Sequence, residues 1–353
     1  MKVLFASLSR IGDYIQHLAV IRAWSIENPD VDVHILVNDL IPEDLMRMNS
    51  QFLHRVLPRF EYQNRINQVS TPLLYPFWSL KKLVRELRDE KYIQVFDLTF
   101  QNHSLAILKL VQPGFGYTLK ETAKINEYLD KNDDIHLIDK LKSIHDLTIS
   151  PKEAIGRPAN KVLFQVSTSD SKKNIDLPRW RTLLDTLKSD FPAIPFMVIS
   201  SQKERKNFLN YFSSNDLLVL SFSELANVFE PETRLVSLDT SIKHFAAQAQ
   251  IPTIELSVGS SHWIKNAAYQ AGNYVFSAEF HCRPCVHSQN CPLGRNQCQD
   301  EISFESLNEF IGQWILSSEP QNYPMKTKVK NGNLSIQRGD KWNQKQIQSN
   351  LHL

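Results

Sequence analysis

The chain has 353 residues, of which 42% are hydrophobic and 22% are charged, and its formal net charge is +2. This is an ordinary globular composition, and the length predicts two domains that each bury a core of their own. A charge so close to balance, without a basic domain or stripe, argues against nucleic acid as a partner.

The N-terminal segment is not expected to act as a targeting signal. Its apolar run, residues 3–8, is too short for a signal peptide and far too short to span a bilayer. We therefore expect a cytoplasmic protein, in which cysteine thiols are kept reduced.

The first half of the chain has the pattern of a parallel α/β domain. An apolar strand, a polar turn that contains Gly12, an amphipathic helix and a second strand follow one another, as in a strand–helix–strand unit. The predicted elements are strands over 3–8, 31–37 and 92–98 and helices over 13–25 and 77–90. The second of these helices has a basic face, formed by Lys81, Lys82, Arg85 and Arg88. A solvated surface and a contact with anionic groups are both open for that face.

A loop-like stretch over 146–160, with Pro151, Gly156 and Pro158, predicts a domain boundary. The α/β alternation then begins again. Strands are predicted over 161–167, 195–201, 217–222, 234–239 and 252–258, and helices over 180–188, 204–212 and 304–316. The pattern predicts two doubly wound α/β domains, 1–155 and 156–317.

A polar extension, 318–353, follows the second domain. Within it, Asn331 and Gly332 stand between two short strand-like segments. Asn-Gly at this place is typical of a type I′ turn, so a β-hairpin is predicted over 328–336.

Asp13 follows Gly12 where the first strand meets its helix. Ligands of open α/β sheets bind at the carboxyl ends of the strands, so one interpretation is a general base. The other is a first-turn acid that interacts favourably with the helix dipole.

The loop after the strand over 161–167 is rich in hydroxyl groups and lysines, among them Ser167, Thr168, Lys172 and Lys173. Hydroxyl groups, backbone N–H groups and a lysine before a helix suit a diphosphate, although the loop is not a Walker motif. On spacing alone, the two lysines also fit an ordinary exposed surface.

The segment after the strand over 234–239 carries a second polar group of residues. Asp239 and Thr240 stand at the start of a helix, and His244 lies in its first turns. Each fits a ligand site, and each also fits a structural role as a helix cap or a buried histidine.

All four cysteines fall in one short run with the spacing C-x2-C-x5-C-x6-C: Cys282, Cys285, Cys291 and Cys298. Four thiolates so close in sequence are typical of a structural zinc or iron site. The other interpretation is four reduced thiols that shape a loop without metal, since the x5 and x6 gaps do not match a standard zinc ribbon.

Together these segments resemble glycosyltransferase family 9, the bacterial ADP-heptose:lipopolysaccharide heptosyltransferase family, over the chain up to about residue 316. The family's N-terminal signature, a strand followed by R-x-G-D, is matched by Arg10, Gly12 and Asp13. Its C-terminal signature has the form L-x-E-L-A, then D-T-G-x-x-H-x-A-A-A, then P-x-x-x-L-x-G. That signature is matched by Glu224, Leu225, Ala226, Asp239, Thr240, His244, Ala246, Ala247, Pro252, Leu256 and Gly259. The cysteine run, followed by an acidic residue and Ile302, resembles the heptosyltransferase II branch.

The resemblance implies the GT-B architecture, in which two Rossmann-like doubly wound domains face each other across a cleft. It implies an acceptor domain that carries the catalytic base Asp13, with Arg10 and Gly12 beside it, and a nucleotide-sugar domain in which Lys173 binds the diphosphate. The implied donor-binding residues are Ser167, Thr168, Lys172, Glu204, Asp239, Thr240, Ser241, His244 and Gly259.

The activity implied is inverting transfer of a heptose from ADP-heptose to a lipopolysaccharide inner-core or related surface glycan, with transient membrane-surface association. No cofactor is required for this catalysis, and zinc or iron on the cysteines would be structural. Two departures from the family pattern bear on the donor: Ser241 replaces a glycine, and Gly259 is followed by serine instead of proline. A protein acceptor, another nucleotide sugar, or a non-catalytic nucleotide-sugar-binding protein of the same fold are the alternatives.

Overall fold

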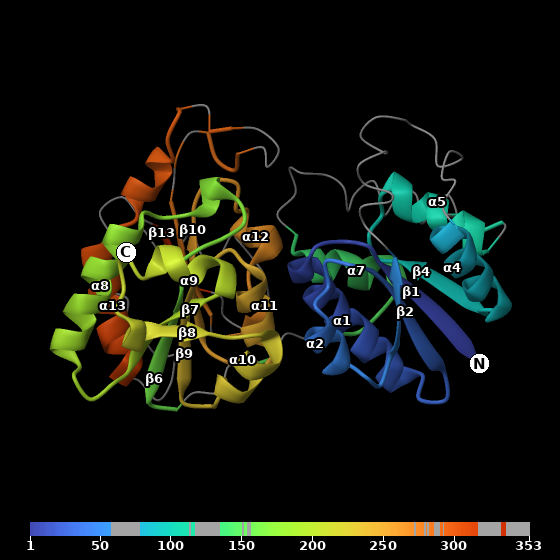
Figure 1. Cartoon of the computed structure of the whole chain (residues 1–353), viewed down its shortest axis with the longest axis horizontal. Coiled ribbons are helices and arrows are strands. Elements are labelled where there is room, and N and C mark those ends of the chain that lie inside the picture. Colours follow the sequence, from blue (N-terminus) through green and yellow to red (C-terminus); the bar gives the residue numbers. More distant parts are fainter. Residues whose placement is uncertain are drawn as a thin grey trace. The chain divides into compact units, whose positions relative to one another are not determined.

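The computed structural model describes residues 1–57, 78–112, 114–116, 135–149, 152–153, 157–271, 273–278, 280, 282–285, 290–291, 293–316 and 333–336. The chain divides into two compact units (Figure 1). The first comprises Met1–Asp133 and Leu137–Ile149, and the second comprises Asp134–His136 and Ser150–Leu353. The sequence places the corresponding division between residues 155 and 156.

The first unit is built on a parallel sheet with the strand order β3-β2-β1-β4. Its strands are β1 (Lys2–Ser7), β2 (Asp32–Asn38), β3 (Leu53–Leu57) and β4 (Gln94–Asp97), and its helices are α1 (Ile11–Glu27), α2 (Glu43–Arg47), α4 (Trp78–Asp89), α5 (Asn102–Val111) and α7 (Leu137–His145). Alternate residues of β1 face opposite sides of the sheet. Leu4 belongs to a buried cluster with residues of α4 and α5, whereas Phe5 contacts Trp24 of α1. Helices therefore cover both faces of the sheet (Figure 1).

The second unit is built on a larger sheet with the order β13-β12-β10-β9-β6-β7-β8. Its strands are β6 (Lys161–Gln165), β7 (Phe196–Ser200), β8 (Leu217–Val219), β9 (Thr233–Leu238), β10 (Thr253–Ser257), β12 (Tyr274–Ser277) and β13 (Asn333–Ile336). Strands β6 to β12 run parallel, and β13 pairs antiparallel with β12. Counted from β6, the parallel strands have the order 3-2-1-4-5-6, which is the strand order of a Rossmann fold.

Helices lie on both faces of this sheet as well. They are α8 (Leu177–Asp190), α9 (Gln202–Phe208), α10 (Phe222–Val228), α11 (Ser241–Gln248), α12 (Trp263–Asn266) and α13 (Phe304–Leu316). Figure 1 shows α8 and α13 on one side of the strands and α10, α11 and α12 on the other. Three 3-10 turns, η2 (Ser171–Lys173), η3 (Ser214–Asp216) and η4 (Gln297–Glu301), and a short pairing of β5 (Lys152–Glu153) with β11 (Gln270–Ala271) complete the described elements.

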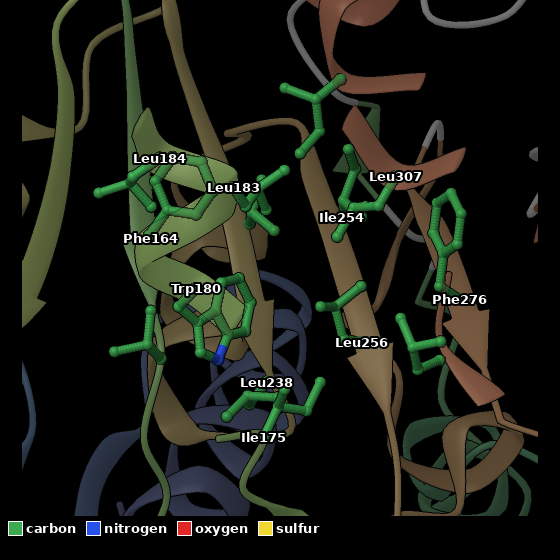
Figure 2. Packing of buried hydrophobic residues seen from close by; sticks show 14 of the residues in the cluster. Phe164, Ile175, Trp180, Leu183, Leu184, Leu238, Ile254, Leu256, Phe276 and Leu307 are labelled. Carbon is green, nitrogen blue, oxygen red and sulfur yellow. The ribbon is translucent and has the colours of Figure 1, made fainter. Parts of the chain in front are cut away.

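A large aromatic and aliphatic cluster holds α8 and α13 on the sheet (Figure 2). Trp180 of α8 is fully buried, and its ring lies 6.1 Å from that of Phe164 in β6 and 5.5 Å from that of Phe304. Burial of large aromatic side chains of this kind contributes strongly to folding free energy. The packing fixes the loop between β6 and α8, which contains the candidate diphosphate-binding residues.

The structure confirms the two doubly wound α/β units and the predicted strands and helices, with most ends shifted by one to three residues. Helix α9 differs, because it runs Gln202–Phe208 and not 204–212. The sequence predictions do not include α2, β3, α5, α7, α12 or β12, nor the two-residue strands β5 and β11. The first arm and the turn of the hairpin predicted over 328–336 lie outside the described residues. Among the residues described, no helix combines the length and the apolar character needed to cross a membrane.

Candidate active site

The carboxyl ends of β6 and β9 form the candidate ligand site of the second unit. These two strands are neighbours in the sheet, and the strand order reverses direction between them. Such a topological switch point is where open α/β sheets bind ligands. The loop between β6 and α8 contains η2 and supplies Lys173, while Asp239 directly follows β9. Their side chains meet at this point, with 2.6 Å between Lys173 Nζ and Asp239 Oδ2.

A buried charge network extends inward from Asp239. Lys243 of α11 is completely buried, and its Nζ lies 2.6 Å from Asp239 Oδ1 and 2.8 Å from Glu255 Oε1. Burial acts to raise the pKa of Asp239, but Lys243 and Lys173 outweigh this effect and hold the pKa well below its usual value. Asp239 is therefore a carboxylate at neutral pH.

Glu255 lies at the inner end of this network, in β10, and is 1% exposed. Burial raises its pKa to about 7, against the opposing effect of Lys243. Sequence reasoning missed both Lys243 and Glu255. The available signal was Glu255 as the one charged residue of β10, an inner strand of a parallel sheet, since a charge at such a place needs a buried partner.

The remaining predicted residues of the loop after β6 make contacts within the protein. Ser167 Oγ donates a hydrogen bond to Glu204, whose carboxylate also accepts from the Ser201 backbone N–H at 3.1 Å and so caps α9. The Thr168 backbone N–H donates to Asn174 Oδ1 at 2.7 Å. The structure thus brings Ser167 and Glu204 together beside the switch point.

Lys172 points away from its neighbour Lys173. Its Nζ lies 3.3 Å from Asp170 Oδ1, and its side chain is only 9% exposed. The interpretation of both lysines as exposed surface residues is therefore wrong, since Lys172 is buried and the Lys173 side chain is 18% exposed and paired with Asp239. The difference arises because the 3-10 turn η2 directs successive side chains to different sides of the loop.

Helix α11 directs its first backbone N–H groups toward the same end of the sheet. Thr240 is its N-cap and accepts a hydrogen bond from the Ile242 N–H at 3.2 Å, and Ser241 is the first helical residue. His244 is 6% exposed. Burial, reinforced by the charge of Lys243, lowers the pKa of His244 well below its usual value, so its imidazole is neutral at pH 7.

Gly259, after β10, lies in contact with the lysine loop. It has a φ of +60°, and a Cβ at this position would lie 1.8 Å from the carbonyl oxygen of Lys172. Only glycine fits this close approach of two backbones. The structure therefore gives Gly259 a packing role, and its predicted contact with a donor stays a prediction.

The cysteine-rich segment supports the same loop from another side. The Asn296 side-chain amide donates to the carbonyl oxygens of Lys172 and Asn174, at 2.7 Å each, on either side of Lys173. Cys298 Sγ donates to Asn296 Oδ1 and accepts from the Gly259 N–H at 3.2 Å. The position of Lys173 thus depends on residues from the end of the cysteine run, a contact that sequence reasoning did not foresee.

The four thiols are neighbours in the structure. Cys282 and Cys285 share a side-chain hydrogen bond, and burial together with the other thiols raises the pKa of Cys285 to about 11. A set of four thiol donors fits zinc or iron by its chemistry. In the described part of the chain, however, no three His, Cys, Asp or Glu side chains are arranged around one metal position.

In the first unit, Asp13 occupies the third position of α1, close after β1. Its Oδ2 accepts a hydrogen bond from the Arg10 backbone N–H at 3.3 Å, and Gly12 lies between them in the first turn. Asp13 thus has the structural role that the alternative interpretation assigned to it, as an acid in the first helical turn. Strand β1 is next to β4 at the reversal of this sheet's strand order, so Asp13 also lies near a switch point.

Comparison with known proteins shows which solved structures share this fold. No protein-family model and no curated protein sequence matches the chain. Solved structures do match. The E. coli ADP-heptose LPS heptosyltransferase II superposes with a TM-score of 0.62 at 13% identity, over 90% of this chain and 99% of that one. A glycosyl transferase of family 9 from Veillonella parvula gives 0.63 at 13% identity, over 89% and 97%. The chain has the GT-B fold of the heptosyltransferases.

This likeness confirms the fold that the sequence resemblance implied, with two Rossmann-like doubly wound units. A third structure of this fold, the E. coli heptosyltransferase WaaC with ADP, has a TM-score of 0.59 at 15% identity and covers 89% of this chain and 100% of its own. In the second unit of this chain, the switch point of the sheet is lined by Lys173, Asp239 and the N-terminus of α11.

Proposed function

We propose that the chain is an inverting glycosyltransferase that transfers a heptose from ADP-heptose to a lipopolysaccharide inner-core or related surface glycan. The observation that carries this proposal is the Lys173–Asp239 pair at the switch point of the second sheet, beside the N-terminus of α11. A lysine and helix-end N–H groups stabilise the negative charge of a diphosphate. A protein of the same fold, WaaC, was solved with ADP, which supports a nucleotide-sugar donor.

In this proposal the donor binds to the second unit with its diphosphate against Lys173 and the first N–H groups of α11. Thr240 and Ser241 flank those groups, and neutral His244 follows one turn later. The donor-side contacts predicted for Ser167, Thr168, Lys172, Glu204 and Gly259 are consistent with their place around the same loop. Lys172 and Gly259 act there mainly by shaping the backbone of the lysine loop.

The proposed chemical step begins at Asp13. Its carboxylate accepts the proton of an acceptor hydroxyl, and the hydroxyl oxygen forms a bond to the anomeric carbon of the heptose. The hydroxyl attacks the face of that carbon opposite the diphosphate. The bond from the carbon to the diphosphate breaks at the same time, so ADP leaves and the configuration inverts. General-base assistance contributes roughly 10²–10⁴ in rate. Lys173 and the helix N-terminus stabilise the negative charge that develops on the leaving group.

The acceptor side rests on the first unit. Helix α4 exposes Lys81, Lys82, Arg85 and Arg88 to solvent. Basic side chains on one helix favour an anionic surface or the phosphate groups of a glycolipid. We propose that the reaction takes place in the cytoplasm at a membrane face, to which the chain would bind transiently.

We also propose that Cys282, Cys285, Cys291 and Cys298 hold a structural zinc or iron ion. No step of the proposed reaction uses this ion, which would stabilise the loop that carries Asn296. Metal analysis of the protein purified from cells is expected to give about one ion per chain. The Cys282→Ser variant is expected to lose most of this metal and to unfold at a lower temperature. Equal, negligible metal in both proteins would show that the thiols shape the loop without an ion.

The test of the enzymatic proposal is release of ADP from ADP-heptose by the purified chain, with and without a glycan acceptor. We expect release that the acceptor accelerates. A protein that binds ADP-heptose but never releases ADP would instead be a non-catalytic nucleotide-sugar-binding protein.

A further inference from the structure

Lys243 is a buried charged group that the proposed reaction does not use. It is completely shielded from solvent, so it cannot itself reach a ligand. Its Nζ lies between two carboxylates, at 2.6 Å from Asp239 Oδ1 and 2.8 Å from Glu255 Oε1. Lys173, by contrast, lies on a loop and is partly exposed, and it contacts the other oxygen of Asp239. Asp239 is therefore shared between an outer lysine and an inner one.

A buried network of charges is unfavourable for the free energy of folding. Burying charged groups carries a large desolvation penalty, and apolar residues of similar volume would often be neutral or more favourable. The Glu255 Oε2 atom is buried and finds no hydrogen-bond partner among the described residues, which adds to the cost. Packing alone does not explain the four groups Lys173, Asp239, Lys243 and Glu255.

The arrangement has a consequence for anion binding at Lys173. A diphosphate that binds Lys173 competes with Asp239 for the same ammonium group. If Lys173 were the sole partner of Asp239, its departure would leave a buried, unpaired carboxylate, which is strongly unfavourable. The contact with Lys243 removes that obstacle, because Asp239 keeps a cation when Lys173 leaves.

We propose that Lys243 and Glu255 are a buried counter-charge pair that keeps Asp239 ionised while Lys173 moves from Asp239 to the donor diphosphate. Lys243 is a positioning residue, since it acts on the ligand through Asp239 and Lys173. The ionisation state of Glu255 sets how strongly Lys243 attracts Asp239, because an ionised Glu255 competes for the same ammonium group. This inference rests on the proposed donor site at Lys173.

The charges give the direction of each substitution. With Glu255 ionised, the four groups sum to zero. Glu255→Gln leaves one net positive charge. Lys243 then has Asp239 as its one carboxylate partner, so Asp239 holds Lys173 less strongly and Lys173 moves to the diphosphate more easily. The double variant Lys243→Met/Glu255→Gln also sums to zero, but Asp239 then depends on Lys173 alone. The two variants should therefore change diphosphate binding in opposite directions.

The experiment compares ADP with AMP, which lacks the second phosphate, by titration calorimetry of the full chain at pH 8. Glu255→Gln is expected to raise the ratio of ADP affinity to AMP affinity by roughly three- to tenfold. Lys243→Met/Glu255→Gln is expected to lower it by about tenfold. The double variant leaves no unpaired lysine or glutamate inside, and its folded state is checked by thermal unfolding. Lys203→Met, at an exposed position of α9, is the matched control.

A purely structural role would change the affinities for both nucleotides together and leave their ratio unchanged. An unchanged ratio in the double variant, or a shift of both variants in the same direction, would overturn the inference. Equal affinity of the wild-type protein for ADP and AMP would overturn the proposed donor site itself, and the inference with it. The two failures are thus distinguishable from the wild-type titration alone.

A pH series gives an independent check that needs only the single variant. The charged groups that face Glu255 are Lys243 on α11, Asp239 after β9, Lys173 in η2 and, from the cysteine-rich segment, Arg283. Since the pKa of Glu255 is about 7, lowering the pH from 8 to 6 protonates it and should raise the wild-type ratio. The ratio measured for Glu255→Gln should lack the part of this rise that comes from protonation of Glu255. An identical pH dependence in the two proteins would contradict the assignment of Glu255.

Discussion

Replacement of Asp13 by asparagine is expected to lower kcat for transfer by roughly 10²–10⁴, the contribution of general-base assistance. Asparagine retains a carbonyl oxygen that can accept the hydrogen bond from the Arg10 N–H, so α1 should form normally. It has no basic oxygen that can accept the proton of the attacking hydroxyl. The measurement is the rate of ADP release in the presence of acceptor.

Donor binding separates this effect from damage to the fold. Asp13 lies in the first unit, while the proposed diphosphate contacts lie in the second. Asp13→Asn should therefore bind ADP with nearly the wild-type Kd. Glu27→Gln, at the exposed far end of the same helix, should leave both rate and binding unchanged. Near-normal turnover by Asp13→Asn would remove Asp13 from the catalytic role and leave it a helix-capping acid.

Replacement of Lys173 by methionine is expected to lower kcat/KM by roughly 10²–10³, because it removes a charged donor aimed at the leaving diphosphate. The fold should survive, since Asp239 keeps its ion pair with Lys243 at 2.6 Å. The matched control is again Lys203→Met, on the exposed surface of the same unit. Steady-state kinetics with varied ADP-heptose measure the effect, and a loss confined to the acceptor KM would contradict the assignment.

Sequence reasoning was sufficient for the alternation of strands and helices and for the residues that carry a local pattern. Apolar strands of parallel sheets and amphipathic helices have periodicities that survive without tertiary context. Asp13, Lys173 and Asp239 were noted because each lies near a strand end, where open sheets place their ligands. Position alone left a structural role open for each, and the family resemblance supplied the predicted catalytic and donor-binding roles. The structure then showed that Lys173 and Asp239 are in direct contact.

The parts that sequence reasoning missed depend on contacts between distant segments. From the sequence, Lys243 is expected to be an exposed lysine of a helix, because lysine is almost never fully buried and no local pattern indicates its partners. Asn296 lies in a loop of no regular pattern, and its two hydrogen bonds reach back more than a hundred residues to the loop of Lys173. Strand β12 has only four residues, Tyr274–Ser277, and is defined by its pairing with β10. The strand order 3-2-1-4-5-6 is likewise a property of the folded sheet.

The cysteine run, for which the sequence indicates a structural metal site or a loop shaped by thiols, also contacts the candidate ligand site in the structure. At its C-terminal end, Asn296 donates to the backbone carbonyls on both sides of Lys173, and Cys298 contacts Asn296 and the Gly259 N–H. The cysteine run therefore supports the proposed donor site whether or not an ion is bound.

The most direct test of the central claim is turnover of a panel of nucleotide sugars that includes ADP-heptose and other ADP-, UDP- and GDP-linked sugars. The purified chain is incubated with each donor and an inner-core glycan acceptor, and the products are read by mass spectrometry. We predict that ADP-heptose is consumed and that the acceptor gains the mass of one heptose, joined with inverted anomeric configuration. Consumption of none of the donors, or transfer with retained configuration, would contradict the account.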